Sequence, residues 1–138
     1  MGTRSTGKFY EEYKEKRIPI CSIYQQYDGY PSGVGLVLAD FLNSRTLVNG
    51  FGVDMDSKTF ANGMGCLSAQ YVAQIKKGIG GVYMTSADDS QAYNYEVIGL
   101  IADGRGAATL KVTVKDYGGE LIFDGDVEEF LEFCERGE

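Results

Sequence analysis

The runs GVYMT (residues 81–85), YNYEVIGLI (93–101), LKVTVKD (110–116) and ELIF (120–123) follow one another closely in the second half of the chain. Each run is short, rich in β-branched or aromatic residues and bounded by Asp, Gly or Ser, which is typical of a β-strand. The pairs Asp103-Gly104 and Gly118-Gly119 fall between successive runs and favour tight hairpins. Because short connections join antiparallel neighbours, this half of the chain predicts a mainly antiparallel sheet.

The rest of the chain adds two strands and three helices. The predicted elements are the strands Thr3–Tyr13 and Ile18–Tyr27, the helices Val34–Leu42 and Gly63–Lys77, and a short helix that begins at a capping-box pattern at Asp126. The stretch Arg45–Ala61 is irregular and is interpreted as a functional loop. We therefore expect a single α+β domain over residues 1–138, with two central helices and a short C-terminal helix packed on one face of the sheet.

Composition restricts the classes of function. The chain has 138 residues, 43% of them hydrophobic, no histidine and a formal net charge of −7. A domain this acidic is not expected to bind long nucleic acid, because that binding requires the neutralisation of many phosphates. The cysteines Cys21, Cys66 and Cys134 form no CxxC pair, and neither a signal peptide nor an apolar run of membrane length is seen. We expect a cytoplasmic protein with three free thiols and no membrane contact.

The residues of the common catalytic and metal sites are missing. Cys66 lies in the first turn of a predicted helix, where the helix dipole lowers a thiol pKa, but a chain without histidine offers it no base. A small buried cysteine is the interpretation that we favour. Asp54-Met55-Asp56 and Asp124-Gly125-Asp126 lack the spacing of a calcium loop. A zinc site is not expected, because the chain has no histidine and no paired cysteines. We predict no catalytic residue, metal or cofactor, while catalysis by carboxylates alone stays open as an alternative.

Two glycine-rich helix starts carry the prediction of a binding site. Residues 28–35 read DGYPSGVG and residues 62–66 read NGMGC. A helix N-terminus offers backbone N–H groups to an anion, and glycine leaves room for a phosphate. Tyrosines near the first segment suit base stacking, and an arginine adds charge. The alternative is that these glycines form turns or permit close packing. The predicted ligand-binding residues are Arg4, Tyr24, Tyr27, Asp28, Tyr30, Pro31, Ser32, Gly33, Asn62, Gly63, Met64 and Gly65.

Three motifs together carry a resemblance: MGTRS at residues 1–5, DGYPSG at 28–33 and NGMGCLSAQ at 62–70. In these motifs and their order the chain resembles a widespread, uncharacterised family of phage and bacterial proteins, over about its first hundred residues. Relatives in that family carry histidine near the DGYPSG motif, where this chain has Val34, so a role that depends on histidine is in doubt here. In size and lack of catalytic residues, the family is similar to phage immune-evasion proteins that sequester signalling nucleotides, the anti-CBASS sponges of cyclic dinucleotides.

The resemblance implies a binding protein that sequesters a small anionic nucleotide without turnover. Such a sponge is expected to be a homo-oligomer, because interfaces favour tyrosine and a shared pocket encloses more of a ligand. The alternative is an acidic protein that inhibits or links other proteins by covering a partner's basic site. Nucleotide binding and product formation separate these hypotheses from each other and from a carboxylate-based enzyme.

Overall fold

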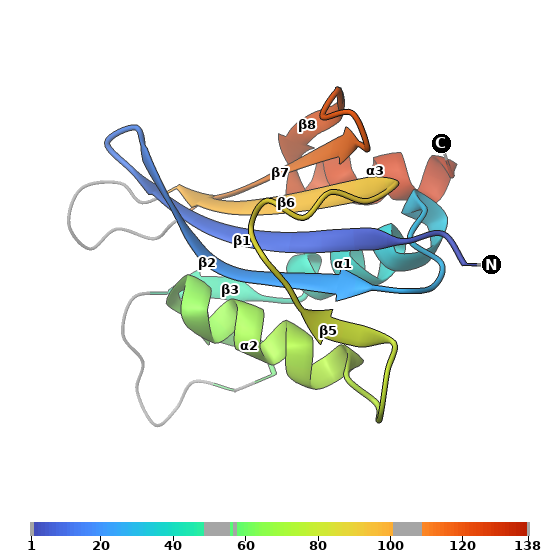
Figure 1. The fold of residues 1–138 in the computed structure, drawn as a ribbon. Coiled ribbons are helices and arrows are strands. Elements are labelled where there is room, and N and C mark those ends of the chain that lie inside the picture. The colour runs from blue at the N-terminus through green and yellow to red at the C-terminus, as the bar shows by residue number, and fades with distance from the viewer. Residues whose placement is uncertain (1, 49–55, 57, 101–108, 138) are drawn as a thin grey trace.

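The computed structural model describes residues 2–48, 56, 58–100 and 109–137, which form a six-stranded sheet, a small two-stranded sheet and three α-helices (Figure 1). The strands of the main sheet are β1 (Ser5–Tyr13), β2 (Lys16–Gln25), β5 (Val82–Met84), β6 (Tyr93–Leu100), β7 (Thr109–Asp116) and β8 (Leu121–Asp126). The small sheet pairs β3 (Thr46–Val48) with β4 (Phe60–Asn62). The helical elements are the π-helical turn η1 (Pro31–Gly35), α1 (Leu36–Asn43), α2 (Gly63–Ile75) and α3 (Val127–Arg136). The predicted hairpin at Asp103-Gly104 and the pair Asp54-Met55 lie outside the described residues.

The predicted α+β class and the mainly antiparallel sheet are confirmed. The strand order is β5-β2-β1-β6-β7-β8, and four of the five pairings are antiparallel. The exception is the parallel pairing of β1 with β6, which local turn patterns do not reveal. It arises because the chain leaves the sheet at β5, on one edge, and returns to its centre at β6 instead of pairing β6 with β5.

All three helices cover one face of the main sheet, as predicted, and aromatic residues join them to it. The ring of Phe9 on β1 lies 5.9 Å from that of Tyr71 on α2, and Phe41 on α1 lies 5.1 Å from the same ring. On the other side of the core, Tyr95 on β6 lies 6.0 Å from Phe130 on α3. These residues belong to one contiguous core, so the helices and the sheet fold as one unit.

The second face of the sheet carries polar residues in register. One row across five strands consists of Ser22, Lys8, Glu96, Thr113 and Asp124. The chain between β5 and β6 runs across this face, in front of β2 and β1 in Figure 1, and we call residues 85–92 the strap. The strap is tied to β2 by the N–H of Thr85, which donates to the Ser22 carbonyl at 2.9 Å. At its other end it is tied to Asn94 of β6, whose Oδ1 accepts from the Gln91 N–H at 2.9 Å.

The C-terminal helix begins as the sequence predicts. The N–H of Glu129 donates to Asp126 Oδ1 at 2.8 Å, and the N–H of Asp126 donates to Glu129 Oε1 at 2.9 Å, which completes a capping box. In the described part of the chain, every helix is too short or too polar to span a bilayer.

Candidate ligand-binding site

The amides of the first glycine-rich segment bond to the chain itself. Asp28 adopts a left-handed conformation with φ 56°, and its carbonyl accepts from the Val34 N–H at 2.7 Å. The N–H of Gly33 donates to the Tyr30 carbonyl at 2.9 Å. These bonds build η1, so the helical region begins at the buried Pro31, earlier than the predicted start at Val34. Amides that were predicted to hold a phosphate therefore bond within the turn.

Two glycines of this segment are required for packing. The hydroxyl of Tyr95 donates to the Gly29 carbonyl at 2.7 Å, which pins the segment to the sheet. A Cβ atom at Gly29 would lie 2.8 Å from the Cβ of Ser5, and one at Gly33 would lie 2.3 Å from the carbonyl oxygen of Asp28. Both distances are too short for a side chain. The packing interpretation, which the sequence left open, thus applies to Gly29 and Gly33.

The second glycine-rich segment opens α2 at the end remote from the first segment. Gly63 has a positive φ of 82°, and Asn62 precedes it as the N-cap residue. Met64 is fully buried, and a Cβ at Gly99 of β6 would lie only 2.6 Å from its sulfur, so Met64 belongs to the core. Gly65 has open space where a Cβ would stand. Because α2 has 13 residues, its start lies about 18 Å from its end, and the two glycine-rich segments do not meet in one cavity.

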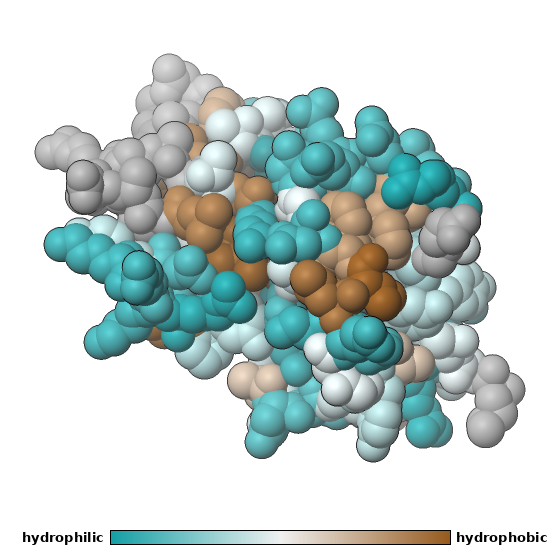
Figure 2. Space-filling model, turned by 90° about the horizontal axis from the view of Figure 1, so that it is seen from above, coloured by the Kyte–Doolittle hydropathy of each residue, from teal (hydrophilic) through white to brown (hydrophobic). Residues whose placement is uncertain are grey.

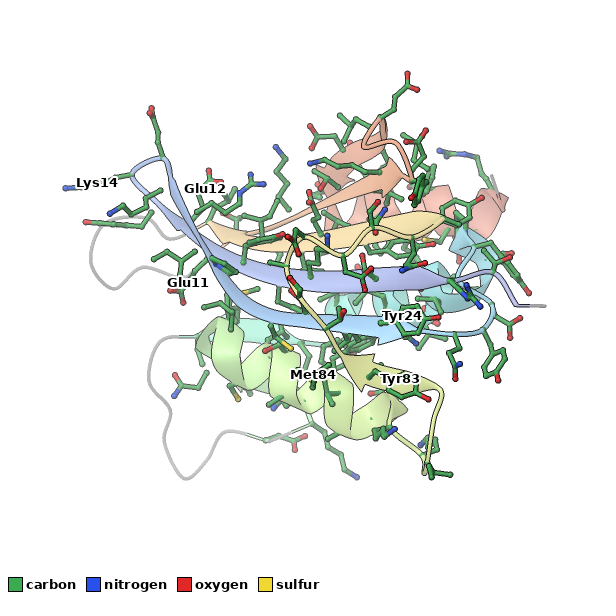
Figure 3. All side chains as sticks on the ribbon, viewed as in Figure 1. Glu11, Glu12, Lys14, Tyr24, Tyr83 and Met84 are labelled. Atoms are coloured by element: carbon green, nitrogen blue, oxygen red, sulfur yellow. The ribbon has the colours of Figure 1, made fainter. Side chains whose placement is uncertain are left out.

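The remaining predicted residues are dispersed. Tyr24 lies on the second face of the sheet, where its ring centroid is 5.9 Å from that of Tyr83 on β5 (Figure 3). The Tyr30 hydroxyl donates to Asp28 Oδ1 at 3.1 Å, and this bond raises the pKa of the phenol. Arg4 is exposed just before β1 and lines none of the hollows described below.

Four predicted residues, Tyr27, Asp28, Ser32 and Gly33, line a hollow of about 640 Å³ between the η1–α1 region and the C-terminal end of α2. Its other lining residues are Gln25, Val34, Leu36, Val37, Asp40, Gln74, Ile75 and Lys77. A second hollow of about 400 Å³ is lined by Gln26, Tyr27, Ile75, Lys77, Gly78, Ile79, Gly80, Gly81 and Val82. The two adjoin, because Tyr27, Ile75 and Lys77 line both, and we call them together the Tyr27 hollow.

The segment Lys77–Gly81 is the part of this site that sequence analysis missed, because Lys77 was predicted only as the last residue of the second helix. Gly80 and Gly81 have positive φ values of 77° and 78°. Gln26 fixes the segment, since its N–H donates to the Gly81 carbonyl at 3.0 Å and its Oε1 accepts from the Gly81 N–H at 3.1 Å. The pattern that identifies it is a run of cations followed by glycines, KKGIGG at residues 76–81.

Tyr27 and Lys77 are the polar residues that line both parts of the hollow. The Tyr27 side chain is 61% exposed. Neither residue makes a side-chain hydrogen bond, ion pair or ring contact with another described residue. A phenol ring and an ammonium group at the junction of two hollows can stack on a flat ring and neutralise an anion. The carboxylates of Asp28 and Asp40 lie in the larger hollow only.

Two of the thiols, those of Cys21 and Cys134, are poorly suited to nucleophilic chemistry. Burial raises the pKa of Cys134 to about 12, and burial also raises the pKa of Cys21. All three cysteines are free. Over the described ranges, no group of three histidine, cysteine or acidic side chains gathers in a way that suits a metal ion.

Comparison with protein-family models, with curated proteins and with solved structures finds no match for this chain.

Proposed function

We propose that this chain binds a small anionic nucleotide in the Tyr27 hollow and sequesters it without turnover. The observation that carries the proposal is the junction of the two hollows, where Tyr27 and Lys77 line both. Their volumes of about 640 and 400 Å³ are of the size that small-molecule sites have. A binding protein of this kind needs no general base, in agreement with a chain that has no histidine.

Charge suggests how the ligand lies. The smaller hollow contains Lys77 and four residues of the glycine-rich loop, and no carboxylate, so it is the part that suits a phosphate. The larger hollow contains Asp28 and Asp40 beside the amides of Gln25 and Gln74, which suit the hydroxyls of a ribose and the polar edge of a base.

Tyr27 lies between these two parts and is placed to stack on the base, and base–aromatic stacking contributes on the order of 1–3 kcal/mol. This arrangement replaces the helix-start cradle that the sequence suggested, while keeping the same class of ligand. A protein that holds a signalling nucleotide in this way lowers its free concentration, which is the action of a sponge.

Isothermal titration with linear and cyclic mono- and dinucleotides tests the proposal. We expect at least one to bind, and Tyr27→Ala and Lys77→Ala each to weaken it by about tenfold to a hundredfold, since a factor of ten corresponds to about 1.4 kcal/mol. Tyr117→Ala and Lys16→Ala are matched controls, because both residues are exposed and neither lines the hollow. The proposal is wrong if no nucleotide binds, or if the two hollow variants bind like the controls.

A further inference from the structure

The two edges of the main sheet differ in how they are protected. At one edge, β5 has three residues, and the ammonium group of Lys76 donates to the carbonyls of Gly80 at 2.9 Å and Val82 at 2.8 Å. A lysine in this position blocks pairing with a further strand. At the other edge, β8 has six residues. Outside β7, no described residue bonds to the backbone of residues 121–124. Alternate N–H and C=O groups along β8 therefore face outward without a partner.

An apolar hollow adjoins the open edge. It has a volume of about 510 Å³ and is lined by Tyr93, Ile122, Phe123, Phe133 and Arg136. The rings of Phe123 and Phe133 stack with centroids 4.9 Å apart and form an aromatic wall. Leu121 and Ile122 are 50% and 42% exposed. Figure 2 looks down on the side that carries the β7–β8 hairpin and shows apolar surface between hydrophilic side chains.

The two faces of β8 differ in chemistry. Asp124 pairs in register with Thr113, so its carboxylate lies on the polar face of the sheet, whereas the carboxylate of Asp126 caps α3. Asp124 is in a partly exposed ion pair with Lys111 at 3.3 Å. Phe123 lies on the face that packs against the helices, next to the apolar hollow. A strand added to β8 would meet the Asp124 carboxylate on one face and apolar groups on the other.

We propose that the β8 edge binds an extended segment of a partner protein, with alternating basic and apolar residues, as an additional antiparallel or parallel strand. Backbone hydrogen bonds supply affinity in this mode, and side chains at alternate positions supply specificity. A basic residue faces Asp124, and the apolar residues enter the hollow beside Phe123 and Phe133. Opposite charges directly across a ladder stabilise it.

A second copy of this chain is a poorer occupant of the same edge. Pairing β8 with β8 of another copy would bring the Asp124 carboxylates of the two copies to the same face of one ladder, where like charges repel. The net charge of −7 on each copy adds to that repulsion.

Three blocked peptides of about seven residues test the proposal by fluorescence anisotropy and by NMR amide shifts. The first alternates lysine with valine, the second has glutamate for lysine, and the third keeps the lysines but has proline for the central valine. We expect the first to bind about tenfold or more tightly than either of the others and to shift amides of β8. The proline peptide separates strand addition from simple attraction to an acidic protein, because it keeps the charge and loses a ladder hydrogen bond.

A matched pair of variants locates the site. Ile122→Lys places a positive charge at the edge and should weaken the lysine–valine peptide about tenfold, whereas Ile18→Lys, at a similarly exposed isoleucine of β2, should not. Equal affinity for the proline peptide and the lysine–valine peptide overturns the proposal even if Ile122→Lys is unstable. Amide shifts confined to other strands, or dimerisation through β8, also overturn it. Nucleotide binding at the Tyr27 hollow does not affect this test, because that hollow shares no residue with the apolar hollow beside β8.

Discussion

Asn94→Ala should cost about 3–5 kcal/mol of unfolding free energy, because the side chain joins the strap to the sheet. Its Oδ1 accepts from Thr6 Oγ1 at 2.6 Å and from the Gln91 N–H at 2.9 Å. Its Nδ2 donates to Ser90 Oγ at 3.2 Å and to the carbonyls of Gln91 at 2.9 Å and Asp116 at 3.2 Å. The two hydrogens on Nδ2 are shared among three acceptors and count as two bonds, and Oδ1 accepts two more. The side chain therefore makes about four full bonds of ~1 kcal/mol each. Thr6 is fully buried, so its hydroxyl would lose its partner.

Thermal and urea unfolding measure this loss. For 138 residues the unfolding entropy is about 0.3 kcal/mol per kelvin, so the expected cost lowers Tm by about 10–17 °C. Asn43→Ala is the comparison, because Asn43 Nδ2 donates to only two carbonyls, of Ala39 at 2.8 Å and Val127 at 3.0 Å, and a cost of about 1–2 kcal/mol is expected. Hydrogen exchange should show faster opening of residues 85–92 in Asn94→Ala. A loss within about 1 kcal/mol of zero would show that these bonds do not hold the strap.

Further predictions follow from the core and from η1. Leu67→Ala should cost about 2–5 kcal/mol in urea unfolding, because Leu67 is fully buried, and an unchanged midpoint would contradict its place in the core. Tyr71→Phe should be neutral or stabilising in the same assay, since the Tyr71 hydroxyl is buried without a hydrogen-bond partner, and a large loss would reveal a partner. Gly33→Val should lower Tm markedly, because its Cβ would lie 2.3 Å from the Asp28 carbonyl oxygen, and normal stability would refute the packing role of Gly33. Burial raises the pKa of Cys134 to about 12, so this thiol should react with a disulfide reagent at pH near 8 only after unfolding, and fast labelling of native protein would disprove its burial.

The sequence predicted the elements well where the information is local. The alternation of apolar residues at 93–100 and 110–116 corresponds to β6 and β7, and the pattern at Asp126 corresponds to the capping box of α3. These features depend on neighbours within a few residues, so one chain is enough to identify them.

The features that the sequence did not predict depend on distant partners. The parallel pairing of β1 with β6 joins residues about ninety positions apart, as in the bond of Thr6 to Asn94. The Asp28 carbonyl accepts from the Val34 amide, and Asp28 has a left-handed conformation that residues other than glycine seldom adopt. A glycine-rich helix start was therefore interpreted as a phosphate cradle when its amides were already bonded.

The position of Lys76 links the proposed nucleotide site to the protection of the sheet. Its ammonium group donates to the carbonyls of Gly80 and Val82 and lies 5.6 Å from the centroid of the Tyr83 ring, so it holds the loop that follows α2 against the edge strand β5. That loop carries the residues that line the smaller hollow beside Lys77. The same contacts that block strand pairing at β5 thus give the smaller hollow its shape. We infer that the two neighbouring lysines have different roles: Lys76 holds the loop in shape, and Lys77 contacts the ligand. Lys76 thus protects the β5 edge beside the proposed nucleotide site, and strand addition is proposed at β8, on the opposite edge of the sheet.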